Sequence, residues 1–241
     1  MLTKKLSSVQ NPLVKHCTRL RLDKKYRLEK KEVLLVGKKE ILEVCKKISP
    51  IKVFLLEGDN QKLKNSIYCS PEVLTKVSGL KNPETSAIFP IPEEEDLSNK
   101  KALLIIDHLQ DPGNVGTLIR SALALNFDAV VLIGSVDPFN DKALRAAKGA
   151  TFFLPVVSMD EKKIVSLTKY RSFYVADLTG QECKEAVIKQ PFALVVGHET
   201  KGPGVWTKSF CKITIPINTN SDSLNVASAG AILMYEMGKK L

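Results

Sequence analysis

Short, uninterrupted apolar runs alternate with amphipathic segments along most of the second half of the chain. The apolar runs cover residues 102–107 (ALLIID), 129–134 (AVVLIG), 172–177 (SFYVAD), 193–197 (ALVVG) and 212–217 (KITIPI). Strands that are apolar at every position, rather than at every second one, are typical of a parallel sheet whose two faces are both covered. Such sheets bind ligands at the loops beyond the carboxyl ends of their strands. We therefore expect an α/β unit that carries its chemistry in those loops.

The first half of the chain also mixes helical and extended patterns. A helix is predicted to begin at Asn11 and Pro12, which are a capping residue and a proline at the first helical position. Residues 38–47 (KKEILEVCKK) are a second amphipathic helix, and residues 33–37 (VLLVG) and 51–58 (IKVFLLEG) are predicted strands. The apolar face of the first helix consists of Leu13, Val14, Cys17 and Leu20.

An acidic, aperiodic stretch separates the two halves. Residues 91–100 (IPEEEDLSNK) follow Pro90 and contain a second proline, which is the composition of a linker between compact units. We therefore predict an N-terminal domain over residues 1–95 and a C-terminal domain over residues 96–241.

The composition is that of an ordinary globular protein, with 44% hydrophobic and 26% charged residues among 241. No apolar run is long enough for a membrane span, and the first ten residues lack the apolar core of a signal peptide, so we expect a cytoplasmic protein without a membrane partner. The five cysteines are scattered without metal-ligand spacing, so we expect reduced thiols and no metal.

The net charge of +10 is concentrated at the N-terminus. Residues 1–50 hold 14 Lys or Arg against 5 Asp or Glu. A concentrated basic face is typical of proteins that bind a polyanion such as RNA, although a solvated helix surface explains the charge equally well. The candidate RNA-binding residues, on the polar side of the first helical region, are Lys15, Arg19, Lys24 and Arg27.

Three segments near the ends of the predicted strands are rich in Gly, Pro, Asn and Ser. In residues 107–122 (DHLQDPGNVGTLIRSA), Asn114 is placed to cap a helix that also carries Arg120. Residues 195–204 (VVGHETKGPG) have Pro203 where a nucleotide-binding loop has lysine, which disfavours ATP or GTP. In residues 215–237, Ser223 and Asn225 stand at the start of a helix. Each segment taken alone is explained as a turn or a helix cap.

Taken in order, the three segments resemble the three signature motifs of SpoU-type methyltransferases, within the SPOUT superfamily of knotted RNA methyltransferases. Thr200 stands where that family often has glycine, which leaves the shape of the second loop open. The first motif is matched by Asp107, Asp111, Pro112, Asn114, Gly116, Arg120 and Ala122, the second by Gly197, Glu199 and Gly202, and the third by Ile215, Pro216, Ser223, Leu224 and Asn225.

The N-terminal half is similar to the substrate-recognition domain that precedes many of these enzymes. It has S-x-x-N-P-x-V-K at residues 8–15 and the pair Tyr26 and Arg27. That domain resembles a small RNA-binding ribosomal protein. The resemblance therefore implies a small α/β RNA-binding domain followed by a parallel-sheet SPOUT domain with a trefoil-knotted C-terminus.

The resemblance also implies the activity, which is transfer of a methyl group from S-adenosylmethionine to a ribose 2′-hydroxyl by a homodimer that uses no metal. Ribosomal RNA is the expected substrate because the best-known transfer-RNA members lack the N-terminal domain. The alternatives are a transfer-RNA ribose methyltransferase, a nucleobase methyltransferase of the same superfamily, and a non-catalytic RNA-binding protein. The implied catalytic residues are Arg120, Asn114, Glu199, Ser223 and Asn225, and the implied cofactor-binding residues are Val196, Gly197, Ile215, Pro216 and Leu224. Arg120 would act either as the base or by orienting the substrate through a phosphate, since arginine holds its proton tenaciously.

Overall fold

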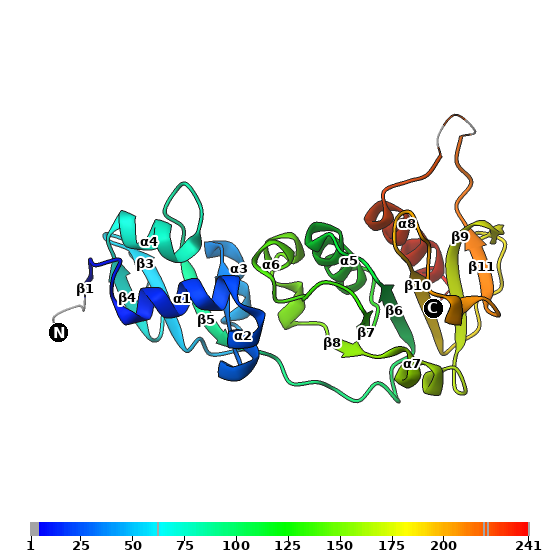
Figure 1. Ribbon diagram of the computed structural model, residues 1–241, viewed down its shortest axis with the longest axis horizontal. Helices are drawn as coiled ribbons and strands as arrows, with labels where there is room; N and C mark the ends of the chain where they lie inside the picture. The colour runs from blue at the N-terminus through cyan, green and yellow to red at the C-terminus, as the bar shows by residue number, and fades with distance from the viewer. Residues whose placement is uncertain (1–4, 62, 219, 221, 241) are drawn as a thin grey trace. The chain divides into compact units, whose positions relative to one another are not determined.

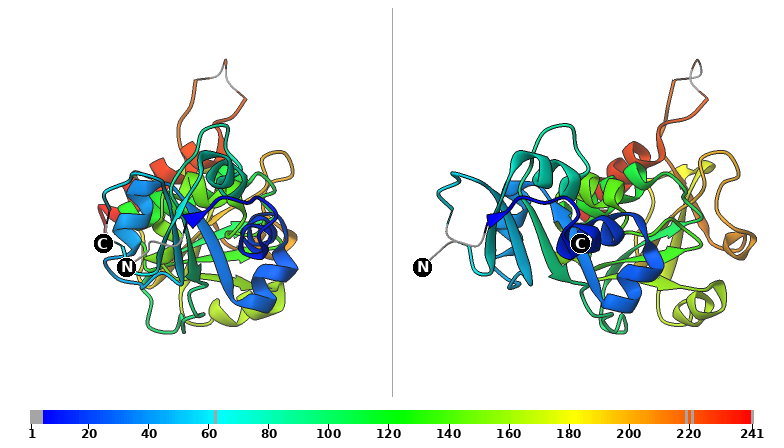
Figure 2. Two further views of the ribbon diagram at one scale, coloured as in Figure 1. Left: turned by 90° about the vertical axis from the view of Figure 1, so that its left-hand side faces the viewer. Right: turned by 60° about the vertical axis from the view of Figure 1, so that its left-hand side comes forward.

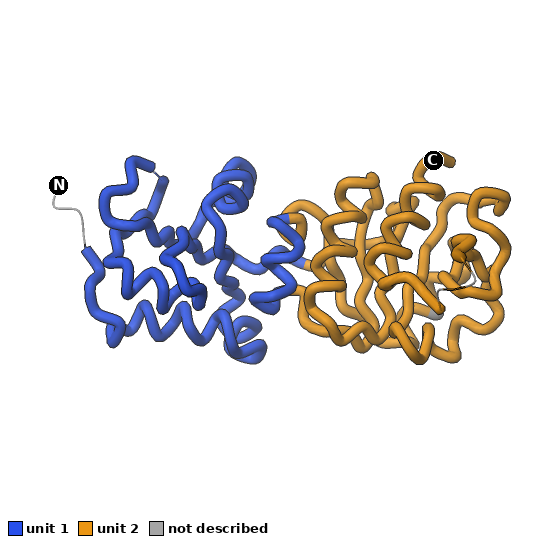
Figure 3. Tube along the Cα trace, turned by 90° about the horizontal axis from the view of Figure 1, so that it is seen from above, with its two compact units in different colours: residues 1–93, 139–149 blue, residues 94–138, 150–241 orange. Residues whose placement is uncertain are grey.

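The chain forms two compact units, and the second is interrupted by a piece of the first. The computed structural model describes residues 5–61, 63–218, 220 and 222–240. The first unit contains residues 1–93 and 139–149, and the second contains residues 94–138 and 150–241 (Figure 3). The predicted division into residues 1–95 and 96–241 did not include this return of residues 139–149, which carry helix α6 (Asp141–Ala147), to the first unit.

A mixed five-stranded sheet organises the first unit (Figure 1). Its strand order is β1-β4-β3-β5-β2; β1 and β3 run parallel to β4, whereas β5 is antiparallel to both β3 and β2. The strands are β1 (Lys5–Leu6), β2 (Glu32–Val36), β3 (Lys52–Leu56), β4 (Ser66–Cys69) and β5 (Ser86–Pro90), and the helices are α1 (Pro12–Leu22), α2 (Lys24–Lys30), α3 (Lys38–Val44) and α4 (Pro71–Ser78).

Helix α1 begins where the sequence predicts. The Asn11 side chain accepts a hydrogen bond from the backbone N–H of Leu13 at 2.9 Å, and Pro12 occupies the first helical turn. The apolar stripe of α1 is buried against α4, whose residues Val73, Leu74 and Val77 belong to the same core. The hydrophobic spacing of residues 13–20 therefore sets which side of α1 faces the sheet and which faces water.

The second unit is built on a fully parallel six-stranded sheet, as the continuous apolar runs predict. Its order is β11-β9-β10-β6-β7-β8, so β6 lies between β10 and β7. The strands are β6 (Ala102–Asp107), β7 (Ala129–Ile133), β8 (Val156–Met159), β9 (Ser172–Glu182), β10 (Phe192–Val196) and β11 (Cys211–Thr214), with short 3-10 helices η1 (Ala150–Phe152) and η2 (Val205–Thr207).

Helices cover both faces of this sheet. Helices α5 (Pro112–Ala124) and α8 (Val226–Gly238) lie side by side in Figures 1 and 2, and they contact β7 and β10 respectively. The close approach of these helices needs Gly230, because a Cβ at this position would lie 2.5 Å from Cδ2 of Leu118 in α5. The opposite face packs against Ile164 of α7 (Glu161–Leu167) and against Trp206. None of the helices in the described part of the chain is long and apolar enough to cross a membrane.

The topology brings two of the three candidate loops together. From β6 the chain moves through α5 to β7 on one side, whereas from β10 it moves past β9 to β11 on the other side. Adjacent parallel strands whose connections leave in opposite directions open a crevice at their carboxyl ends, which is where open α/β sheets bind ligands. The segments after β6 and β10 border that crevice.

Candidate active site

The side chain of Asn114 joins all three candidate loops. Its Nδ2 donates a hydrogen bond to Oε1 of Glu199 at 2.9 Å, and its Oδ1 accepts one from Nδ2 of Asn225 at 3.1 Å. These residues lie 85 and 111 positions from Asn114 along the chain. One amide therefore fixes the relative positions of the loop after β6, the loop after β10 and the start of α8.

Asn114 is not the helix cap that the sequence predicts. The cap of α5 is Asp111, whose Oδ1 accepts a hydrogen bond from the backbone N–H of Asn114 at 2.8 Å, and Pro112 follows at the first helical position. The cap prediction was wrong by three residues because Asp and Asn are equally good capping residues. Since Asp111 satisfies the helix start, the amide of Asn114 is available for Glu199 and Asn225.

Asn225 does cap α8, as its position in the sequence predicts. Its Oδ1 accepts hydrogen bonds from the backbone N–H groups of Ala227 at 2.9 Å and Ser228 at 3.2 Å. Its Nδ2 remains directed to Asn114. One side chain thus starts a helix and ties that start to the loop after β6.

The loop after β10 is a tight turn that holds Glu199. The backbone N–H of Gly202 donates to the carbonyl oxygen of His198 at 2.8 Å, and Gly202 has a φ of 68°, which favours glycine. Thr200 donates its backbone N–H to Nδ1 of His198 at 3.2 Å. A Cβ on Gly197 would lie 2.2 Å from the nitrogen of Pro203, so the two ends of the turn close only over glycine.

A pocket of about 410 Å³ lies within the second unit beside this turn. Its walls are mainly apolar, and they combine the middle of β9 with the carboxyl ends of β10 and β11, the segments that follow them and the start of α8. Of the five expected cofactor-binding residues, Pro216 is the one that does not line it. The expected residues that do line it are Val196, Gly197, Ile215 and Leu224, together with the expected catalytic residues Glu199 and Ser223.

Asp177, a carboxylate in the wall of the same pocket, is not among the residues that the sequence motifs predict. Its pKa is lowered to about 2 by hydrogen bonding to Lys212, whose Nζ lies 2.9 Å from Oδ2, and to Thr179. The carboxylate is therefore charged at neutral pH. Its place at the end of the predicted strand 172–177 was the available signal, although β9 continues to Glu182 and Asp177 lies where the pairing of β9 with β11 is irregular.

Arg120 lies apart from this pocket. It is exposed on α5, does not line the cavity, and forms no hydrogen bond or ion pair with any of the described residues. The structure thus brings Asn114, Glu199, Ser223 and Asn225 to the pocket or its edge, and leaves the guanidinium of Arg120 exposed and without a partner among the described residues.

The four candidate RNA-binding residues differ in accessibility. Lys15, Arg19 and Lys24 are exposed in the first unit, and the guanidinium of Arg19 lies 3.7 Å from the ring centroid of Tyr26. The assignment of Arg27 is wrong, because it is 3% exposed and its Nη1 donates to the carbonyl oxygen of Leu20 at 2.7 Å. Its guanidinium donates hydrogen bonds to carbonyl oxygens at the end of α1 and is not on the surface that RNA could reach.

The cysteines and the acidic residues show no sign of metal chemistry in the described part of the chain. No group of three or more His, Cys, Asp and Glu side chains there could hold a metal ion. Cys17 and Cys69 are fully buried, and burial raises the pKa of both thiols, that of Cys69 to about 12.

Comparison with known proteins identifies the family to which this chain belongs. The model of the SpoU rRNA Methylase family matches residues 101–235. The chain is 33% identical to the 23S rRNA (guanosine(2553)-2'-O)-methyltransferase RlmP of Bacillus subtilis (strain 168), over 97% of this chain and 99% of that protein.

Solved structures share the fold over nearly the whole chain. The AdoMet-bound rRNA methyltransferase from Sinorhizobium meliloti has a TM-score of 0.86 and 23% identity, covering 99% of this chain and 98% of that one. The SpoU methyltransferase AviRb from Streptomyces viridochromogenes, in complex with AdoMet, has a TM-score of 0.85 and 20% identity, covering 96% and 98%. At these identities the likeness establishes the fold.

Proposed function

Because the chain belongs to the SpoU rRNA methylase family, we propose that it transfers a methyl group from S-adenosylmethionine to a ribose 2′-hydroxyl of ribosomal RNA. The resemblance inferred from the three motifs is confirmed by the family match. The observation that carries the proposal is the hydrogen-bonded set Asn114, Glu199 and Asn225, which joins the three motifs beside a pocket of about 410 Å³.

The pocket has the chemistry that S-adenosylmethionine needs. Its apolar walls, including Val196 and Leu224, suit the adenine ring, and two carboxylates, Asp177 and Glu199, suit a ligand with a positive sulfonium and ammonium. When bound, S-adenosylmethionine supplies an electrophilic methyl group. The open loops at the strand ends offer backbone N–H and C=O groups for the polar edge of the adenine.

The chain's own residues would act mainly by positioning. Methyl transfer to a hydroxyl requires an in-line approach, so orientation of the ribose accounts for much of the rate. We assign Arg120 the role of orienting the substrate through a phosphate, because a guanidinium keeps its proton and presents a planar fork of donors. Asn114, Glu199 and Asn225 hold the loops in register, and Ser223, which lines the pocket, would help to position the ribose.

We infer further that the chain has a trefoil-knotted C-terminus and that it works as a homodimer in the cytoplasm, with its RNA substrate. The outer face of α8 supports the dimer, because Ile232 and Tyr235 are 42% and 54% exposed one helical turn apart. Exposed apolar side chains on one helix face are typical of a subunit interface.

The first unit would bind RNA by its basic surface. Lys15, Arg19 and Lys24 are exposed there, and Lys15 also lines a hollow between α1 and α4 together with Arg21, Lys76 and a single acidic residue, Glu72. Closely spaced cations of this kind fit the phosphates of an RNA backbone. The unit would thus hold the RNA and leave methyl transfer to the second unit.

The test is a methyl-transfer assay with the full-length protein, labelled S-adenosylmethionine and unmodified ribosomal RNA, followed by mapping of the modified nucleotide. We expect a 2′-O-methylated ribose in ribosomal RNA. Label in transfer RNA alone, or on a base, would replace the proposed substrate, and a folded protein that binds RNA without transferring methyl groups would overturn the activity.

A further inference from the structure

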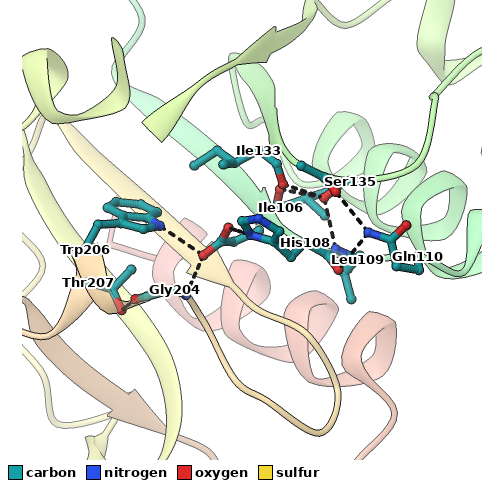
Figure 4. Close-up of polar contacts among 11 residues, drawn as sticks. Ile106, His108, Leu109, Gln110, Ile133, Ser135, Gly204, Trp206 and Thr207 are labelled. Atoms are coloured by element: carbon teal, nitrogen blue, oxygen red, sulfur yellow. Dashed lines mark hydrogen bonds and ion pairs between the residues drawn. The ribbon is translucent and has the colours of Figure 1, made fainter. Parts of the chain in front are cut away.

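The last residue of β6 carries a fully buried carboxylate that the mechanism above does not use. Asp107 is 0% exposed, and its Oδ2 accepts hydrogen bonds from the backbone N–H of Gly204 at 2.7 Å and from Nε1 of Trp206 at 3.0 Å (Figure 4). Its Oδ1 lies 2.6 Å from Nδ1 of His108. A buried carboxylate is retained only with such a set of donors, since its desolvation otherwise opposes folding.

The two donors to Oδ2 come from the last residue of the turn that lines the pocket, Gly204, and from Trp206 in η2 just after it. The turn runs from Gly197 to Gly204, and Glu199 and Pro203 within it line the pocket, whereas Asp107 does not. The approach is close, because a Cβ on Gly204 would lie 2.7 Å from Cδ1 of Trp206 and 3.1 Å from Oδ2 of Asp107, so a larger residue here would displace the indole or the carboxylate. Asp107 is therefore hydrogen-bonded to one end of this turn, whereas Asn114 is hydrogen-bonded to Glu199 in its middle.

The opposite side of Asp107 is itself rigid. The segment after β6 is tied to the end of β7, because Oγ of Ser135 accepts from the backbone N–H of Leu109 at 3.0 Å and lies 3.0 Å from the carbonyl oxygen of Ile106. Gln110 adds a hydrogen bond from Nε2 to the carbonyl oxygen of Gly134 at 2.9 Å (Figure 4). The carboxylate is thus a fixed point between the centre of the sheet and the turn.

We propose that Asp107 is a positioning residue, which holds the turn of residues 197–204 in the conformation that binds S-adenosylmethionine. This inference rests on the proposed function for its ligand, but the anchoring of the turn can be measured without any ligand. Preorganised loops bind more tightly because less conformational freedom is lost on binding. Loss of the anchor should therefore loosen the turn and lower cofactor affinity.

The chain offers a matched control at the other end of the same strand. Oδ2 of Asp128 accepts hydrogen bonds from the backbone N–H groups of Lys101 at 2.7 Å and Ala102 at 2.9 Å, at the start of β6. This carboxylate also receives two N–H groups, but it lies at the edge of the sheet away from the pocket. Substitution there removes two hydrogen bonds from a partly exposed carboxylate of the same sheet without disturbing the turn.

The chain also contains its own spectroscopic probe, because Trp206 is the one tryptophan in the sequence. Its ring packs edge-on against Phe173 and Phe210, with centroids 6.2 Å and 5.9 Å away. Its fluorescence emission therefore reports on the environment of the indole N–H, which donates a hydrogen bond to Asp107. We expect an altered emission maximum in Asp107→Ala and an unchanged one in Asp128→Ala.

The experiment compares the full-length parent with Asp107→Ala, Asp107→Asn, Asp128→Ala and Asp128→Asn by hydrogen exchange and by titration with S-adenosylmethionine. Asp107→Ala should speed exchange at residues 197–206 and weaken cofactor binding about tenfold, or about 1.4 kcal/mol. Asp107→Asn keeps one oxygen acceptor, so a loss of about threefold is expected. Both Asp128 variants should bind like the parent, and if Asp107→Ala does not fold, the two Asn variants give the same comparison.

The outcomes test the positioning role of Asp107 separately from the identity of the cofactor. Unchanged exchange at residues 197–206, or equal cofactor affinity in the Asp107 and Asp128 variants, would overturn the positioning role. A folded parent that does not bind S-adenosylmethionine would overturn the proposed cofactor, and faster exchange in Asp107→Ala would then still support the anchor.

Discussion

At the scale of a single side chain, the role of Arg120 in methyl transfer can be tested by substitution. It is exposed, forms no ion pair or hydrogen bond with the described residues and does not line the pocket, so its removal should leave both the fold and the cofactor affinity unchanged. Arg120→Ala should nevertheless lower the rate of methyl transfer at least about a hundredfold, since misplacement of a reactant costs that much. Arg120→Lys should also be slow, because a point ammonium does not reproduce a planar fork.

The measurement is single-turnover methyl transfer at saturating S-adenosylmethionine, with circular dichroism as the control for folding. Lys162→Ala, which removes an exposed cation from α7 of the same unit, should transfer methyl groups at the parent's rate. A near-parental rate for Arg120→Ala would show that Arg120 is a surface charge with no role in methyl transfer.

Individual residues also show where sequence patterns mislead. Periodicity placed Arg27 on the polar side of the first helical region, but α1 ends at Leu22 and α2 begins afresh at Lys24. The phase of a helix does not carry across such a break, so Arg27 is turned inward to the carbonyl oxygens of Leu20 and Arg21. The spacing within α1, which has no break, correctly predicts that Val14, Cys17 and Leu20 are buried.

At the scale of elements, the start of α5 separates a structural role from a functional one. Asp111 caps the helix, whereas Asn114 connects it to Glu199 and Asn225. Asp111→Ala should lower the free energy of unfolding by about 1 kcal/mol, the usual effect of losing a cap. Asn114→Ala removes no cap, so it should be less destabilising, yet it should slow methyl transfer by about a hundredfold because the three loops lose their register.

Chemical denaturation and methyl transfer, measured on both variants, decide between these roles. Greater destabilisation by Asn114→Ala than by Asp111→Ala, together with a parental rate, would return Asn114 to the role of a helix cap.

The elements of the parallel sheet were predictable because their strands are buried on both faces. The runs at residues 102–107, 129–134 and 193–197 match β6, β7 and β10 within one residue at either end. The edge strand β8 was not predicted, since Val156–Met159 is only partly buried and includes a polar serine. Helix α4 was also missed, although Ser70, Pro71 and Gly79 are a cap, an N-terminal proline and a left-handed end residue with a φ of 71°.

At the scale of the whole molecule, the pairing of distant segments lies beyond local sequence patterns. Nothing in residues 139–149 alone indicates that they pack with the first unit, where Lys148 forms an ion pair with Glu40 at 3.1 Å. The meeting of Asn114 with Glu199 and Asn225 follows from strand order, which periodicity does not determine. The family motifs predicted which residues belong together because they preserve the order of the three loops.

The last prediction follows from the charge distribution. It is that the first unit binds RNA, whereas the second unit binds the cofactor. If Lys15, Arg19 and Lys24 contact phosphates, replacing all three with alanine should weaken RNA binding and lower the slope of log affinity against log salt by roughly 0.7 to 0.9 per contact. Cofactor affinity should not change, because the pocket is lined by the second unit alone. The measurement is RNA affinity across a salt series for the full-length parent and the triple variant.

The matched control replaces Lys162, Lys163 and Lys169, three exposed lysines of the second unit, so the net charge falls by the same amount. Its salt slope should stay near the parent's, because exposed charges that do not touch RNA are screened beyond about 8 Å at physiological salt. Arg27→Ala should behave differently again, lowering stability without altering the slope, since its guanidinium is buried against α1. Equal slopes for the triple variant and the parent would show that RNA is not recognised by this basic surface.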